Sequence, residues 1–199
     1  MGAVVMLNSQ LVASSNRELS AYVPLRFDQR SFAFRGGVVI LGSLFLAVCS
    51  WISVPMVPVP VTMQTFGFLI LGALCGWRLA LGASLAYLFE GAVGLPVFAG
   101  GAAGLQQLLG PTGGYLIAFP LAAALAGLVA EKGWTLGILR SFTLMILGHA
   151  VILTFGTAYL ATQIGADKAI MFGFTPFLLG SVLKAALATS ILEAVRRGR

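Results

Sequence analysis

The sequence has very little charge. Only 9% of its 199 residues are charged, whereas an ordinary soluble domain has about 25%. Apolar residues make up 59% of the chain, and the mean hydropathy is +0.99. This composition excludes a soluble globular protein and indicates that several segments are surrounded by lipid.

Motifs for catalysis and metal binding are also missing. The sequence contains no phosphate-binding loop, no His-Glu-x-x-His zinc motif and no nucleophile elbow. Its two cysteines, Cys49 and Cys75, lie in apolar runs without His or Cys at ligand spacing, which argues against a zinc site or a disulfide framework. We therefore expect neither an enzyme nor a metal or cofactor site.

Long apolar runs dominate the rest of the sequence. A membrane-spanning helix needs about 20 apolar residues, and the prolines at positions 55, 58 and 60 end the first run. We predict an all-α integral membrane protein whose six transmembrane helices form one domain at 34–195, between a cytoplasmic leader at 1–33 and a basic cytoplasmic tail at 196–199. The six runs are residues 34–54, 62–75, 79–93, 115–130, 136–162 and 176–193.

The basic residues test this arrangement, since cytoplasmic segments of membrane proteins are enriched in Lys and Arg. With both termini in the cytoplasm, ten of the twelve basic residues fall on the inner side, whereas Lys168 is outside and Lys184 lies within a span. The net charge of +6 is therefore attributed to membrane topology and not to nucleic-acid binding. The ten inner residues are Arg17, Arg26, Arg30, Arg35, Arg78, Lys132, Arg140, Arg196, Arg197 and Arg199.

Two predicted outer connections, 55–62 and 94–114, contain no charged residue. The longer one is rich in glycine and apolar residues, so we predict a loop that folds back into the bundle, similar to a re-entrant loop. Irregular backbone is tolerated there when protein surrounds it or when it lines a cavity. A flexible glycine linker is the alternative.

Polar residues gather in the outer half of the predicted bundle, where Gln64, Glu90, Thr112, Tyr115 and Lys184 form a candidate site. Inserting a lysine into a span costs on the order of 3 kcal/mol, so such a lysine normally faces a partner or a wet cavity. The alternatives are that Lys184 reaches the membrane surface and that Glu90 is simply solvated.

Other residues within the spans have simpler interpretations. His149 is expected to form an interhelical hydrogen bond, although a ligand contact or proton relay is the alternative. Small residues such as Ser43 and Ala47 would allow another helix to approach closely.

Three motifs in this order resemble the BioY family. They are Val57–Thr65 (VPVPVTMQT), Glu90–Gly101 (EGAVGLPVFAGG) and Leu109–Leu116 (LGPTGGYL). BioY proteins are the biotin-binding subunits of energy-coupling factor transporters. The resemblance implies a six-helix subunit of the bacterial plasma membrane that captures biotin from outside. It further implies partnership with a transmembrane coupling protein and two cytoplasmic ATPase subunits, in the lipid bilayer.

The resemblance also assigns residues. Gln64, the 110–115 loop with Thr112 and Tyr115, and Lys184 match the family's binding motifs, while Ser43 and Ala47 match its contact with the coupling protein. Ser181 stands where the family usually has an aspartate, three residues before the lysine. Ser181 accepts hydrogen bonds but cannot neutralise Lys184, so the ligand carboxylate or Glu90 must supply the negative charge.

Other functions remain open at this point. The same bundle would suit a solitary carrier that needs no ATPase, or a capture subunit for another small vitamin. An intramembrane enzyme using Glu90 and His149 is a third hypothesis.

Overall fold

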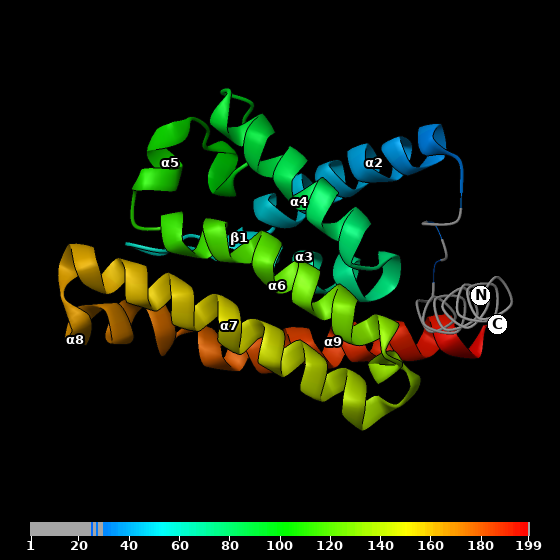
Figure 1. The fold of residues 1–199 in the computed structure, drawn as a ribbon. Coiled ribbons are helices and arrows are strands. Elements are labelled where there is room, and N and C mark those ends of the chain that lie inside the picture. Colours follow the sequence, from blue (N-terminus) through cyan, green and yellow to red (C-terminus); the bar gives the residue numbers. More distant parts are fainter. Residues whose placement is uncertain (1–24, 26, 28–29, 199) are drawn as a thin grey trace, which may run out of the picture.

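The computed structural model describes residues 25, 27 and 30–198, and it is almost entirely helical (Figure 1). The prediction of an all-α membrane protein is confirmed. The main helices are α2 (Phe32–Trp51), α3 (Gln64–Cys75), α4 (Trp77–Ala92), α6 (Gly113–Glu131), α7 (Ile138–Ile164) and α9 (Phe177–Arg197). The short elements are β1 (Ser53–Val54), β2 (Val61–Thr62), η2 (Ala99–Gly101), α5 (Leu105–Leu109), η3 (Trp134–Leu136), α8 (Ala166–Ala169) and the π-helical η4 (Ile170–Phe174).

Each predicted apolar run corresponds to one main helix, but the helices differ in length. Four segments of the described chain are long and apolar enough to cross a membrane, namely α2, α6, α7 and the continuous stretch Ala166–Arg197. Helix α3 has 12 residues, which is about 18 Å at 1.5 Å per residue, whereas the hydrocarbon core is about 30 Å thick. Six crossings therefore remain a prediction.

Helix ends follow from local sequence. Pro176, the first residue of the sixth predicted run, lies directly before α9, where a proline loses no helical hydrogen bond. Gly76 both ends α3 and begins α4, with φ of 82°. Glycine adopts this left-handed conformation without steric cost, so the chain turns there within one residue.

Helix α6 is the centre of the bundle, where it packs against α3, α4 and α7. In its most apolar 18-residue segment 67% is buried inside the molecule, compared with 28% for the corresponding segment of α2. Small residues allow the neighbouring helices to approach α6 this closely. A Cβ atom on Gly127 would lie 2.4 Å from the backbone nitrogen of Trp77, and one on Gly72 would lie 2.3 Å from the carbonyl oxygen of Ala123.

The outer connections cover the bundle, and the longer one folds back against the core in part. Strands β1 and β2 pair in antiparallel fashion, and this hairpin brings Val59 into the core at 4% exposure. In the longer connection Phe98 is buried against Gly91 and Tyr87. Leu105 and Leu109 of α5, however, are 61% and 74% exposed, so α5 lies largely at the surface, whereas Phe98 and the partly buried Val97, Ala102 and Leu108 pack against the core.

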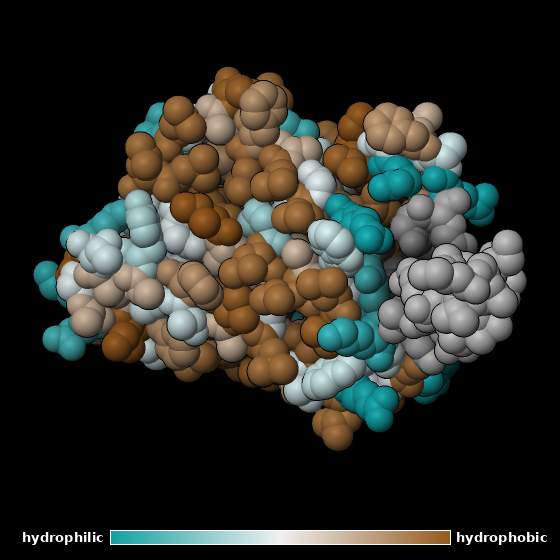
Figure 2. All heavy atoms as spheres, in the orientation of Figure 1, coloured by the Kyte–Doolittle hydropathy of each residue, from teal (hydrophilic) through white to brown (hydrophobic). Residues whose placement is uncertain are grey.

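Apolar side chains cover much of the surface between the two ends of the molecule, where hydrophilic residues gather (Figure 2). The start of α2 and the end of α9 lie at the same end of the bundle (Figure 1). This surface suits a protein surrounded by lipid tails.

The close approach at Gly127 generates the first prediction. Gly127→Ala should lower the thermal stability of the detergent-purified protein, because the added methyl group meets backbone atoms of Gly76 and Trp77. Overpacking of this kind costs about 1–3 kcal/mol. Gly36→Ala is the matched control, since no atom lies within 4 Å of its added Cβ. Equal melting temperatures for the two variants would contradict the packing described here.

Candidate functional site

A small cavity lies among α3, α6, α7 and α9, beneath the β1–β2 hairpin. Its volume is about 40 Å³. Most of its wall is apolar, while hydroxyl groups and one ammonium group converge on it. The lining residues are Val59, Pro60, Thr62, Thr65, Thr112, Tyr115, Leu116, Phe119, Leu153, Phe177 and Lys184.

Lys184 provides the charge at this cavity. Lys184 belongs to α9 and is buried, with 9% of the residue exposed. The ammonium Nζ donates to the backbone carbonyl of Thr62 at 2.5 Å and to Thr65 Oγ1 at 3.3 Å. Among the described residues no carboxylate forms an ion pair with it, since the salt bridges there join Glu193 to Arg196 and Arg197. A buried cation held only by neutral oxygens favours an anionic ligand.

A hydrogen-bond network behind the cavity fixes the position of Thr62. Thr62 Oγ1 donates to Gln64 Oε1 at 3.0 Å, and the Gln64 backbone nitrogen donates to Thr62 Oγ1 at 3.2 Å. Gln64 Nε2 then donates to the Tyr87 hydroxyl at 2.6 Å, and that hydroxyl donates to the Val97 carbonyl. The network therefore ties the start of α3 to α4 and to the outer connection.

Tyr115 connects the cavity wall with the π-helical segment before α9. Its hydroxyl donates to the Gly173 carbonyl at 2.7 Å and lies 3.3 Å from Thr157 Oγ1. Its ring stacks on Phe177 with centroids 6.0 Å apart. These contacts hold the ring in the cavity wall.

The structure brings three of the predicted site residues together, because Thr112, Tyr115 and Lys184 line one cavity. Gln64 lies directly behind this cavity and is 4% exposed. Ser181 is buried one helical turn before Lys184, but it is outside the lining set.

Glu90 lies elsewhere. Its Oε1 accepts a hydrogen bond of 2.8 Å from Ser43 Oγ on α2, and no ion pair links it to Lys184 in the described chain. Glu90 therefore forms no ion pair with Lys184 in the described structure, and its role as a charge partner stays a prediction. Ser43 and Ala47 are 0% and 5% exposed, so their close helix contact is made within this chain. A contact of Ser43 and Ala47 with the coupling protein stays a prediction. It would require α2 to move away from α4, against which it packs.

His149 differs from the expectation of an interhelical hydrogen bond. Its Nδ1 lies 2.8 Å from the Met145 carbonyl of its own helix, α7, while Nε2 has no hydrogen-bond partner among the described residues. Because Glu90 pairs with Ser43 and His149 with Met145, the two residues form no shared catalytic pair. The described residues also contain no group of three or more His, Cys, Asp or Glu that could hold a metal ion.

Sequence reasoning assigned three of the eleven residues of the cavity wall to the site and missed the other eight. Phe119 follows Tyr115 at helical spacing, a signal that predicts one shared face, and Thr62 and Thr65 flank Gln64 in the motif at 57–65. No local signal marks Leu153 or Phe177, because tertiary packing alone brings them there.

The sequence is similar to one protein family and to several named proteins. A profile of the BioY family matches residues 28–199. The chain is 40% identical over 161 residues to the "Probable biotin transporter BioY" of Pyrococcus horikoshii, covering 79% of this chain and 95% of that protein. It is 38% identical over 156 residues to the "Biotin transporter BioY2" of Lactococcus lactis, covering 76% and 84% respectively.

A solved structure is also similar. The fold superposes with a TM-score of 0.73 on the S-component for biotin from an ECF-type ABC transporter. The match has 23% sequence identity and covers 84% of this chain and 95% of the solved one. At this identity the match shows a shared fold.

The network behind the cavity generates the second prediction. Tyr87→Phe should destabilise the protein, because Gln64 Nε2 loses its buried acceptor, and an unsatisfied buried group costs about 1–3 kcal/mol. Thermal unfolding in detergent measures the loss. Tyr159→Phe is the control, since that hydroxyl bonds the Leu109 carbonyl at an exposed position. A Tyr87→Phe variant as stable as this control would show that the network does not hold the start of α3.

Proposed function

Because this chain belongs to the BioY family, we propose that it captures biotin as the substrate-binding S-component of an ECF-type transporter. Its relatives of known name are biotin transporters, and its fold is that of an S-component. The observation that carries the proposal is the buried ammonium of Lys184, which faces a mostly apolar cavity without an ionic partner in the described chain.

Biotin suits these groups chemically. It has a carboxylate on a flexible chain, an apolar thioether ring and a ureido group with two N–H donors and one carbonyl acceptor. In this proposal Lys184 binds the carboxylate, since Glu90 is engaged by Ser43. The Thr65 hydroxyl, which accepts from Lys184, can donate to the ligand, while Thr112 and Tyr115, whose protons go to the Gln107 and Gly173 carbonyls, offer acceptors. The aromatic wall contacts the rings.

The cavity must widen to accept this ligand. Its volume is about 40 Å³, whereas pockets for small organic ligands measure about 300–1,000 Å³. Val59 and Pro60, in the loop between β1 and β2, form part of the wall. Because this loop belongs to a short outer hairpin, we propose that its outward movement opens the cavity.

The partners proposed for the chain are a transmembrane coupling protein and two cytoplasmic ATPase subunits. The sequence contains no phosphate-binding loop, so ATP-driven uptake would draw its energy from other chains. We propose that biotin enters from the outer side, with both termini in the cytoplasm, because the basic residues gather at the ends of the predicted spans that this orientation places inside.

The third prediction tests the function directly. The purified full chain should bind biotin, and Lys184→Ala should weaken binding at least tenfold, because the carboxylate loses its only charged contact in the described site. The uncharged amide of biotin should bind wild type correspondingly weakly. Calorimetry or intrinsic tryptophan fluorescence measures both affinities.

Lys168→Ala is the control, since Lys168 is an exposed lysine that does not line the cavity. No biotin binding by wild type would overturn the proposed function. If the amide binds as tightly as biotin while Lys184→Ala binds poorly, the lysine contacts the ureido group instead.

The fourth prediction concerns orientation. In intact cells a cysteine placed at Ala166 should react with a membrane-impermeant maleimide, whereas one at Gly198 should react only after the membrane is opened. The native Cys49 and Cys75 are buried, so their background labelling should be low. The reverse pattern would place the termini outside.

A further inference from the structure

A second hollow lies between α6 and α7, and its volume is about 360 Å³. Small residues form its floor, where Ala122 and Ala126 are 0% and 2% exposed and Gly148 is buried. Larger residues form its rims, where Leu125 and Leu147 are 41% and 53% exposed. The hollow is therefore an apolar groove, which we call the α6–α7 groove, and it opens toward the lipid.

The groove has the length of one membrane leaflet. Along α6 it extends from Ala122 to Lys132, which is about 15 Å at 1.5 Å per residue. The hydrocarbon core is about 30 Å thick, so one leaflet contributes about 15 Å. A single acyl chain running from the headgroup level to the midplane would match this length.

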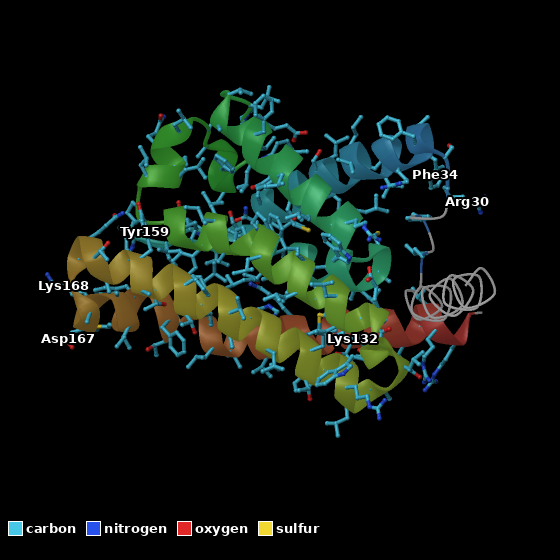
Figure 3. The ribbon with its side chains drawn as sticks, viewed as in Figure 1. Arg30, Phe34, Lys132, Tyr159, Asp167 and Lys168 are labelled. Carbon is cyan, nitrogen blue, oxygen red and sulfur yellow. The ribbon has the colours of Figure 1, made fainter. Side chains whose placement is uncertain are left out.

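One end of the groove is polar. Lys132 and Trp134 line it there, directly after the end of α6 (Figure 3). Trp134 is 37% exposed, and tryptophan is typical of the membrane–water interface. The other residues of the lining are apolar, so the charge of the groove is confined to the end where a headgroup would lie.

The charge of Lys132 is available to a ligand. Lys132 is exposed and forms no ion pair within the described part of the chain. Arg196 and Arg197 behave differently, because both are paired with Glu193. An apolar helix from another protein would leave Lys132 without a counter-charge, and free phosphate would leave the apolar floor exposed. Only an amphiphile with a negative head matches both features.

We propose that the α6–α7 groove binds an anionic phospholipid of the leaflet at the Lys132 end, with one acyl chain in the groove and the headgroup phosphate at Lys132. A cation near a membrane surface attracts anionic lipid by about 1 kcal/mol, which corresponds to about fivefold in affinity. The site is separate from the biotin cavity, with which it shares no lining residue. It does not depend on biotin being the ligand.

The fifth prediction measures lipid retention by native mass spectrometry of the full chain in detergent. With equal amounts of phosphatidylglycerol and phosphatidylcholine, both carrying the same acyl chains, wild type should retain the anionic lipid about fivefold more. Lys132→Gln should reduce this preference to near unity. Lys168→Gln, a charge-matched change at the other end of the bundle, should keep it.

Ala126→Leu tests the acyl chain, because its larger side chain would fill the floor and lower the retention of both lipids. Unchanged melting temperature shows that this variant is folded, and Lys132→Gln decides the question if it is not. Glycerol phosphate, which has the headgroup charge without acyl chains, should not compete. Equal retention of the two lipids by wild type, an unchanged preference in Lys132→Gln, normal retention by a folded Ala126→Leu variant, or competition by glycerol phosphate would each overturn the proposal.

Discussion

A charged ammonium group inside an apolar bundle must be surrounded by oxygen atoms, and this requirement organises the site. Lys184 finds them in the Thr62 carbonyl and the Thr65 hydroxyl. The Thr62 carbonyl can accept from Lys184 because β2 ends at Thr62 and α3 begins only at Gln64. Gln64 in turn is held by Tyr87, and Tyr87 by the outer connection at Val97. One buried charge thus links α9, α3, α4 and the outer cover, so a ligand that binds Lys184 also acts on the elements that enclose it.

The small residues of α6 have two consequences. On one side they let α3 and the start of α4 approach to backbone contact, which places the cavity against a closely packed helix. On the other side Ala122 and Ala126 lie buried beneath the α6–α7 groove, so that a hollow remains between the exposed rims at Leu125 and Leu147. A helix made of large residues would fill the groove but would also push α3 away. In the proposed assembly the same central helix therefore contacts both the vitamin site and the surrounding membrane.

The candidate site could be predicted in part. Thr112, Tyr115 and Lys184 were recognisable because polar residues are rare in these spans and depth along a helix follows from residue number. Depth does not specify which face of a helix points inward. Gln64 and Glu90 have suitable depth, yet one lies behind the cavity and the other bonds Ser43 on α2. Ser43 and Ala47 have the spacing of a helix contact, but spacing alone could not show that the contacting helix belongs to the same chain.

The sequence by itself determined the class of protein, the positions of the main helices and the family, because hydropathy, prolines, glycines and short motifs are local properties of the chain. Tertiary structure alone decided that Phe98 is the fully buried residue of the longer outer connection, and that Leu153 and Phe177 share a wall with Lys184. These features depend on how the helices pack around α6. That packing results from contacts between residues far apart in the sequence, which no local pattern records.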